Sequence, residues 1–237
     1  MDRTSAEAWL SLRHTILTFL SDSRNLLKLN IKTFVMRLNK IHLTLVVVIC
    51  AAACAFSYSQ ETGSFTDSRD GHEYKTVKLG DQWWMGENMA YKTDSDCWVY
   101  EGIEGYAETY GYLYSWEAAK DVCPEGWHLP TDAEFVILWG FLGGSETDGG
   151  KLKETGTDHW NSPNAGATNS SGFTALSSGT SGDNEHKMYL GLITYFWTSE
   201  DLDDDIGDSW ALYSAKAEFT RYGLPKEDGV SVRCLKD

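Results

Sequence analysis

The stretch CPEGWHLPTDAEF, Cys123–Phe135, joins two segments with helical periodicity and decides how the first half of the domain folds. Pro124 and Gly126 end the first segment, because proline lacks an N–H donor and glycine favours non-helical backbone. Thr131 and Glu134 form a capping box, in which a hydroxyl and a carboxylate bond the free N–H groups at a helix start. The stretch therefore predicts two helices that meet at a rigid corner.

Apolar residues mark one face of each predicted helix. In residues 110–123, YGYLYSWEAAKDVC, they recur at three- and four-residue steps, which is typical of a helix with one buried side. These positions are Leu113, Trp116, Ala119 and Cys123. The second helix begins at Thr131 and ends at Gly143-Gly144. Its expected buried stripe is Phe135, Leu138, Trp139 and Leu142.

Cys123 and His128 give this stretch a second interpretation. A catalytic dyad would need the Cys123 thiolate within hydrogen-bond reach of the His128 imidazole. The alternative is that Cys123 is half of a disulfide at a structural corner. Because Cys123 falls on the apolar helix face and we expect the domain outside the cytoplasm, we favour the structural alternative. The sequence then predicts a non-catalytic domain and leaves His128 without an assigned role.

Residues 62–237 are expected to form a single α+β domain. Gly80-Asp81 separates two strand-like segments, 74–79 and 82–85, which predicts a hairpin. Fourteen of the twenty residues between Ala165 and Asn184 are Gly, Ser, Thr or Asn, which indicates loops and short strands that are either a binding surface or disordered. Strand character returns in residues 189–199, 209–219 and 229–237. We expect the first and last strands to pair.

Residues 36–57, MRLNKIHLTLVVVICAAACAFS, have the layout of a secretory signal, with basic residues, an apolar run and then small residues. We assign the signal peptide to residues 36–55. The apolar run falls short of the ~20 residues that a membrane-spanning helix needs, so a membrane anchor is the weaker alternative. Residues 1–35 lie ahead of the signal. Either Met36 is the true initiator, or these residues form a cytoplasmic extension.

Two cleavage sites fit the end of this segment. Ala51–Cys54 resembles a bacterial lipobox, which makes Cys54 a candidate for lipidation, although alanine stands at Ala51 where leucine is usual. Ala53-Cys54-Ala55 fits an ordinary signal-peptidase site equally well. Both sites predict an extracytoplasmic domain that is secreted or held at the cell surface as an outer-membrane lipoprotein.

The charge of the chain excludes some partners. Its net charge is −15, and residues 1–54 contain seven of the 20 basic residues but only three of the 35 acidic ones, so the domain is more acidic still. Such a charge repels nucleic acid and anionic lipid. We therefore expect no nucleic-acid partner and no contact with a membrane other than through a lipid anchor.

Three ordered motifs resemble the Fibrobacter succinogenes major paralogous domain family. They are FTDSRDGHEYKTVKLGDQWWMGENMAY (65–91), YGYLYSWEAAKDVCPEGWHLPTDAEF (110–135) and GVSVRCLKD (229–237). GWHLPTDAEF and GVSVRC are also similar, more weakly, to the C-type-lectin-like fold and the formylglycine-generating enzymes. The resemblance implies a C-type-lectin-like α+β fold with a mixed or antiparallel sheet, two helices and a long irregular loop region. It implies placement outside the bacterial cytoplasm, and no defined activity.

The resemblance also bears on the cysteines beyond Cys54, which are three in number. Family members often carry a further cysteine where this chain has Ala107, and that cysteine pairs with one near Cys97. Cys97 therefore lacks its partner, and a Cys123–Cys234 disulfide is expected. An enzyme of the formylglycine-generating type is the alternative function, but such enzymes use two closely placed cysteines where this chain has only Cys234.

We expect the ligand, a carbohydrate or a protein at the cell surface, to be bound by the loops of residues 155–208. The candidate ligand-binding residues are Trp98, Trp160, Asn164 and Asn169, and both tryptophans are expected to be exposed. No cofactor is required. The acidic run EDLDDDIGD, residues 200–208, offers oxygen ligands for Ca²⁺, but its spacing differs from an EF-hand and a solvated acidic turn is favoured. The metal candidates are Asp201, Asp203, Asp204, Asp205 and Asp208.

Overall fold

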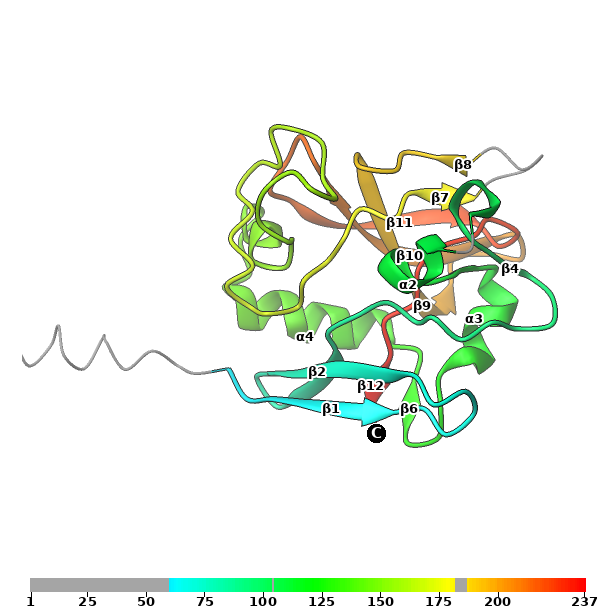
Figure 1. Ribbon diagram of the computed structural model, residues 1–237. Coiled ribbons are helices and arrows are strands. Elements are labelled where there is room, and N and C mark those ends of the chain that lie inside the picture. The colour runs from blue at the N-terminus through cyan, green and yellow to red at the C-terminus, as the bar shows by residue number, and fades with distance from the viewer. Residues whose placement is uncertain (1–59, 104, 182–186) are drawn as a thin grey trace, which may run out of the picture. The chain divides into compact units, whose positions relative to one another are not determined.

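Two antiparallel sheets, with a helix packed against both, organise the domain (Figure 1). The computed structural model describes residues 60–103, 105–181 and 187–237, and Gln60–Asp237 form one compact unit. The predicted signal peptide, the residues before it and Cys54 lie outside the described residues. Among the described residues, no helix is long and apolar enough to cross a membrane.

The elements follow one another in an order typical of an α+β domain. The strands are β1 (Thr62–Thr66), β2 (Glu73–Leu79), β3 (Gln82–Met85), β4 (Cys97–Trp98), β5 (Leu113–Tyr114), β6 (Trp127–His128), β7 (Thr180–Ser181), β8 (Lys187–Met188), β9 (Ile193–Asp201), β10 (Ile206–Tyr213), β11 (Phe219–Pro225) and β12 (Leu235–Lys236). The helices are η1 (Tyr100–Gly102), α2 (Gly105–Tyr110), α3 (Trp116–Val122), α4 (Asp132–Leu142) and η2 (Asp148–Lys151).

The first sheet has five strands in the order β1-β2-β3-β12-β6. Its β2–β3 hairpin confirms the predicted turn, and Gly80 there has a φ of 65°, a left-handed conformation that favours glycine. Leu235 of β12 pairs with Trp84 on one side and with His128 on the other. The closing strand thus lies beside the opening hairpin, and β1, which the sequence analysis did not predict as a strand, forms the outer edge.

The second sheet has three strands in the order β11-β10-β9. Helix α4 packs on both sheets, because one core cluster joins its side chains to residues of each. From α4 the cluster contains Phe135 and Leu138, from the first sheet Trp84, and from the second sheet Phe196 and Trp210. A second cluster gathers around α3 and the residues after β11. These two clusters fix the two sheets relative to each other.

Helix α4 has the predicted start and end. Thr131 accepts a hydrogen bond from the Glu134 N–H, and the Glu134 carboxylate accepts one from the Thr131 N–H, so the capping box is complete. Gly143 follows the last turn with a φ of 125°. Phe135, Leu138 and Leu142 are buried, as expected, and Trp139 is half-buried.

The predicted helix over residues 110–123 is shorter in the structure. Helix α3 begins only at Trp116, after the Ser115 side chain caps it, and Leu113 belongs to strand β5. A separate short helix, α2, ends before Gly111, whose φ is 75°. A Cβ at Gly111 would lie 2.5 Å from the carbonyl oxygen of Met89, so the backbones approach too closely there for the helix to continue.

The disulfide between Cys123 and Cys234 is present, which confirms the expected pairing. It joins the end of α3 to the segment before β12 across 111 residues, with a Cα–Cα distance of 5.9 Å. Cys97 is free and half-buried. Because Cys123 is held in a disulfide, it has no thiolate to offer, and the hypothetical dyad with His128 is not formed.

The described part of the predicted loop region, residues 165–181, contains no helix and only the short strand β7. Lys153 anchors the neighbouring loop from inside. Its side chain is fully buried, and Nζ donates to the carbonyl oxygens of Ala165, Tyr213 and Lys216 at 2.8–2.9 Å. Burial lowers the pKa of Lys153 to about 8. The loop is therefore a packed structure and not an open linker.

Candidate functional site

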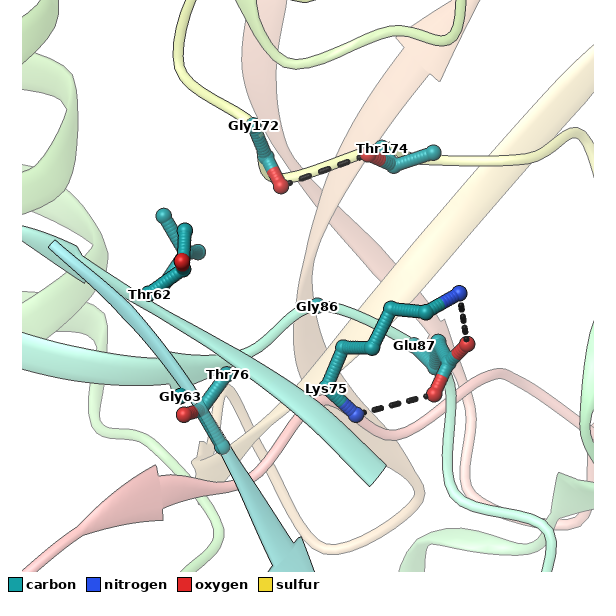
Figure 2. A pocket seen from close by; sticks show the side chains of 9 residues that line it. Thr62, Gly63, Lys75, Thr76, Gly86, Glu87, Gly172 and Thr174 are labelled. Carbon is teal, nitrogen blue, oxygen red and sulfur yellow. Dashed lines mark hydrogen bonds and ion pairs between the residues drawn. The ribbon is translucent and has the colours of Figure 1, made fainter. Parts of the chain in front are cut away.

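A groove of about 310 Å³ lies on the face of β1 and β2 that looks toward the loop of residues 172–174 (Figure 2). We call it the β1–β2 groove. It is lined by Thr62, Gly63, Lys75, Thr76, Val77, Gly86, Glu87, Gly172 and Thr174. Threonine hydroxyls, one ion pair and glycine backbone give this lining its hydrogen-bonding groups, and carbon atoms form the larger part of its exposed surface.

The ion pair in the β1–β2 groove joins Lys75 of β2 to Glu87, which follows β3. Lys75 Nζ lies 3.2 Å from Glu87 Oε1, and the Lys75 backbone N–H donates to Glu87 Oε2 at 3.0 Å (Figure 2). Burial alone would raise the pKa of Glu87, but these hydrogen bonds and the charge of Arg233 hold it below its usual value. Glu87 is therefore ionised at neutral pH and available as an acceptor.

The loop wall of the groove is held in an unusual conformation. Thr174 has a φ of 52°, which is uncommon for a β-branched residue, and Gly172 has a φ of 68°. Asn169 fixes this conformation, since its Oδ1 accepts from the Thr174 N–H at 2.9 Å and its Nδ2 donates to the Thr174 hydroxyl at 3.0 Å. Asn169, a predicted ligand-binding residue, thus positions a groove residue.

Arg233 supports the same wall from inside the domain. Its guanidinium donates to the carbonyl oxygens of Phe173, Thr174 and Met85 and, through Nε, to Asn88 Oδ1 at 2.8 Å. The side chain is 1% exposed, and burial lowers its pKa to about 9 while the Glu87 charge opposes this. Arg233 remains a cation at neutral pH. The groove therefore contains Lys75 and Glu87 and lies next to a second, buried cation.

Arg233 belongs to the closing motif of the chain, residues 229–237. The family model of the Fibrobacter succinogenes major domain matches residues 77–236. The chain belongs to this family. No curated protein and no solved structure matches the chain. Within the Fibrobacter succinogenes major domain, Arg233 and the Cys123–Cys234 disulfide lie inside the matched residues, whereas β1 and most of β2 precede them.

Trp160 corrects an expectation. We expected an exposed side chain, but Trp160 is 1% exposed and its indole N–H donates to the Ala175 carbonyl oxygen at 2.9 Å. The ring also lies 5.3 Å from the buried Lys153 Nζ. The polar residues around Trp160 in the sequence do not show that the loop folds inward here. Trp160 anchors the loop and cannot contact a ligand at the surface.

Trp98 and Asn164 have mainly structural surroundings. Trp98 is half-buried in β4, and its ring packs close to Gly229, where a Cβ would lie 2.8 Å from the ring. Asn164 is buried with a φ of 43°, and its Nδ2 donates to the carbonyl oxygens of Glu154 and Gly156 at 2.8 Å each. Its Oδ1 is buried without a partner among the described residues. Neither residue lines the β1–β2 groove.

The acidic run does not gather its carboxylates at one point. Asp201 pairs with Lys226 at 2.8 Å, and Asp203 accepts from the backbone N–H groups of Asp205 and Ile206 in the turn between β9 and β10. Asp204 and Asp205 are exposed, whereas Asp208 is fully buried. The run therefore forms a turn, as the favoured alternative predicts, with Asp208 facing the interior.

Among the residues that the structure describes, one group of carboxylates is close enough to share a metal ion. It consists of Asp132, Glu200 and Asp208. Arg221 already lies among them, 2.7 Å from Asp208 and 3.2 Å from Asp132. Burial raises the pKa of Asp208, and the Arg221 hydrogen bond opposes this. The guanidinium offsets part of the negative charge of the three carboxylates. Of the five predicted metal ligands, only Asp208 belongs to the cluster.

His128 bridges two carboxylates at the corner between α3 and α4. Its Nδ1 lies 2.7 Å from Asp237 Oδ1, and its Nε2 lies 3.0 Å from Glu134 Oε1. Burial opposes protonation of His128, but the two hydrogen bonds outweigh this and raise its pKa. His128 thus links the end of the chain to the start of α4, a role that the sequence did not show.

Sequence reasoning did not identify most of the β1–β2 groove. Only Gly172 and Thr174 fall within the loop region that we expected to bind a ligand. Thr62 belongs to β1, and Lys75 and Glu87 lie within the motif of residues 65–91, which indicated a family and not a binding site. The one signal is that Lys75 is an exposed charge within a strand whose neighbours are buried.

Proposed function

We propose that this chain is an exported, non-catalytic binding domain, secreted or held at the bacterial cell surface, and that it binds a carbohydrate in the β1–β2 groove. The carrying observation is the groove lining, with the hydroxyls of Thr62 and Thr174, one lysine–glutamate pair and three glycines around one hollow. Sugars present neighbouring hydroxyl groups, each of which both donates and accepts hydrogen bonds. A lysine beside a carboxylate supplies a donor and an acceptor next to each other.

The charges refine the ligand class. Lys75 in the groove and the buried Arg233 beside it are two cations, whereas the groove lining contains one carboxylate, that of Glu87. Arg233 makes no ion pair with a carboxylate among the residues described. A sugar that carries a carboxylate, such as a uronic acid, would complement this excess. We therefore infer that an acidic glycan binds more tightly than its neutral counterpart.

Export is supported by the leader-like residues 36–55 and by the Cys123–Cys234 disulfide, because disulfides persist outside the reducing cytoplasm. We also propose that the α+β arrangement is of the C-type-lectin-like kind. Its support is the placement of β12 beside the opening hairpin, together with the loop region that packs against the sheets. A protein ligand at the same groove is the competing proposal.

A glycan array that includes neutral and uronic-acid oligosaccharides tests the proposal, with and without a calcium chelator. We expect binding that survives chelation and that Lys75→Ala weakens at least tenfold. Lys216→Ala is a matched control, since Lys216 and Glu218 also form an exposed pair at 3.2 Å but lie outside the groove. Equal binding by both variants, or no glycan bound by the folded protein, contradicts the proposal.

A further inference from the structure

Strand β1 forms an edge of the first sheet to which no described strand is paired. Its register and hydrogen bonds show which groups face outward. Lys78 N–H donates to the Glu61 carbonyl oxygen, so residue 61 bonds β2. Gly86 N–H donates to the Lys75 carbonyl oxygen, so Lys75 bonds the β3 side and its partner in β1, Ser64, is left facing outward. In the alternating pattern of antiparallel strands, residues 61, 63 and 65 therefore bond β2. Thr62, Ser64 and Thr66 therefore direct their N–H and C=O groups away from the sheet.

This edge lacks the features that usually prevent edge-to-edge pairing. The strand TGSFT contains no charge and no proline, and its pairing with β2 runs through all five residues without a register shift. The surrounding chain has a net charge of −15, which opposes contact between two copies at most other surfaces. An uncharged, regular edge is thus an exception on this molecule.

A second hollow lies next to this edge, on the face opposite to the β1–β2 groove. It measures about 180 Å³ and is lined by Gly63, Ser64, Phe65, Thr76, Trp83, Trp127 and Lys236. Phe65 and Trp127 are in ring contact at 5.3 Å, and a Cβ at Gly63 would lie 3.8 Å from the Trp83 ring. We call it the aromatic hollow. It is open above Gly63 because that residue has no side chain.

We propose that two copies of this chain associate through β1, which pairs antiparallel with β1 of the second copy about a two-fold axis at Ser64, so that Phe65 of each copy covers Gly63 of the other. The outward backbone groups require this register. Thr62, Ser64 and Thr66 can form hydrogen-bonded pairs with Thr66, Ser64 and Thr62 of the second copy, and every outward group then finds a partner.

The side chains fit the same register. Gly63 and Phe65 become a non-hydrogen-bonded pair, in which side chains lie closest, and an aromatic ring over a cross-strand glycine is a stabilising pair in sheets. The Phe65 ring, which contacts Trp127 in the single chain, turns outward in the dimer to lie over Gly63 and beside Trp83 of the second copy. Thr62 faces Thr66, which is also a favourable pair. At the strand ends Glu61 faces Asp67, but each carboxylate already pairs with its own cation, Lys78 at 3.3 Å and Arg69 at 2.6 Å.

The result is one continuous ten-stranded sheet with a closed two-fold symmetry. A two-fold axis through a residue pair stands perpendicular to the sheet, so both copies present their β1–β2 grooves on the same side. Two grooves side by side would bind a repeating glycan with higher avidity than one.

Sedimentation of the full chain over a range of protein concentrations measures the association. We expect a reversible dimer whose dissociation constant rises at least tenfold in Ser64→Lys, because the two lysines would face each other on the axis. Ser64→Glu should dissociate in the same way, and an equimolar mixture of the two variants should form the dimer again. A monomer at every concentration, or a dimer that Ser64→Lys leaves intact, overturns the proposal.

Cysteine cross-linking tests the register. Residues in a hydrogen-bonded pair have Cα atoms about 5.5 Å apart, within disulfide range. Ser64→Cys should therefore form a covalent dimer under mild oxidation. Thr66→Cys is the matched control. Thr66 of one copy faces Thr62 of the other, so the two Thr66 residues lie about four residues apart along the strand, roughly 13 Å, which is too far for a disulfide. Equal cross-linking by the two variants overturns the register, and co-purification of a different protein strand in place of a second copy overturns the choice of partner.

Discussion

The Arg233 guanidinium donates a hydrogen bond to the carbonyl oxygen of Thr174 at 3.2 Å, across 59 residues of sequence. This contact joins the closing motif of the domain to the wall of the β1–β2 groove. Phe173 and Met85 contribute further carbonyl acceptors to the same guanidinium, and Phe173 also lies beneath its plane at 4.4 Å. One buried cation thus organises the loop, the end of β3 and the groove.

Arg233→Met should lower the free energy of unfolding by about 2–4 kcal/mol, because methionine fills the volume but leaves several buried acceptors without a donor. Urea unfolding monitored by tryptophan fluorescence measures this. The same variant should lose order in residues 172–174, which hydrogen exchange reports. A loss below about 1 kcal/mol would show that the guanidinium does not hold the wall.

Lys153→Met should be destabilising by about 2–4 kcal/mol, since three buried carbonyl oxygens lose their donor. Lys151→Met is the control in the same segment. Lys151 is half-buried, and its Nζ lies 2.8 Å from Asp148 and donates to the Leu142 carbonyl oxygen, so its loss leaves fewer buried acceptors and should cost less than that of Lys153. Chemical unfolding of both variants makes the comparison. Similar losses in the two would contradict the anchoring role of Lys153.

The His128 bridge predicts a pH dependence of stability. Because the folded-state pKa of His128 is raised above 6.5, its contribution is fully present below pH 6.5 and is lost as pH rises through the raised value. His128→Gln removes this contribution, so the difference in stability between wild type and variant should shrink as the pH increases from 6 toward 8. The side chain is 37% exposed, and solvent screening keeps the effect below about 1 kcal/mol. A difference that grows with pH would contradict the assignment.

The Cys123–Cys234 disulfide closes a long loop and should contribute about 2–4 kcal/mol. Replacing both cysteines with serine should lower the melting temperature accordingly, whereas Cys97→Ser, which removes the free thiol, should have little effect. Alkylation without reduction provides a direct check on the native protein. It should modify Cys97 alone among the three cysteines, and modification of Cys123 or Cys234 would exclude the disulfide.

Local patterns predicted the parts of the fold that depend on neighbouring residues. The capping box at Thr131 and the turn at Gly80 are decided within a few positions, and both are present. The helix over residues 110–123 was predicted too long because its interruption depends on Met89, which packs against Gly111 from a distant segment. Periodicity cannot report such a contact.

The candidate site was harder to predict for the same reason. Trp160 was expected at the surface because its neighbours in sequence are polar, but its burial depends on Lys153 and Ala175. The β1–β2 groove combines residues from β1, β2 and the loop at 172–174, and no sequence spacing relates them. Arg233 was visible only as part of a strand-like motif, and its contacts lie 59–148 residues away.

The most direct test of glycan binding in the β1–β2 groove is a calorimetric titration of the tightest array ligand against Thr62→Val and Thr157→Val. Thr62 lines the groove, whereas Thr157 is an exposed threonine that lies outside both the groove and β1. We predict that Thr62→Val weakens binding by about threefold to tenfold, the value of one hydrogen bond, and that Thr157→Val leaves it unchanged. Equal affinities for both variants and the wild type would contradict binding at this groove.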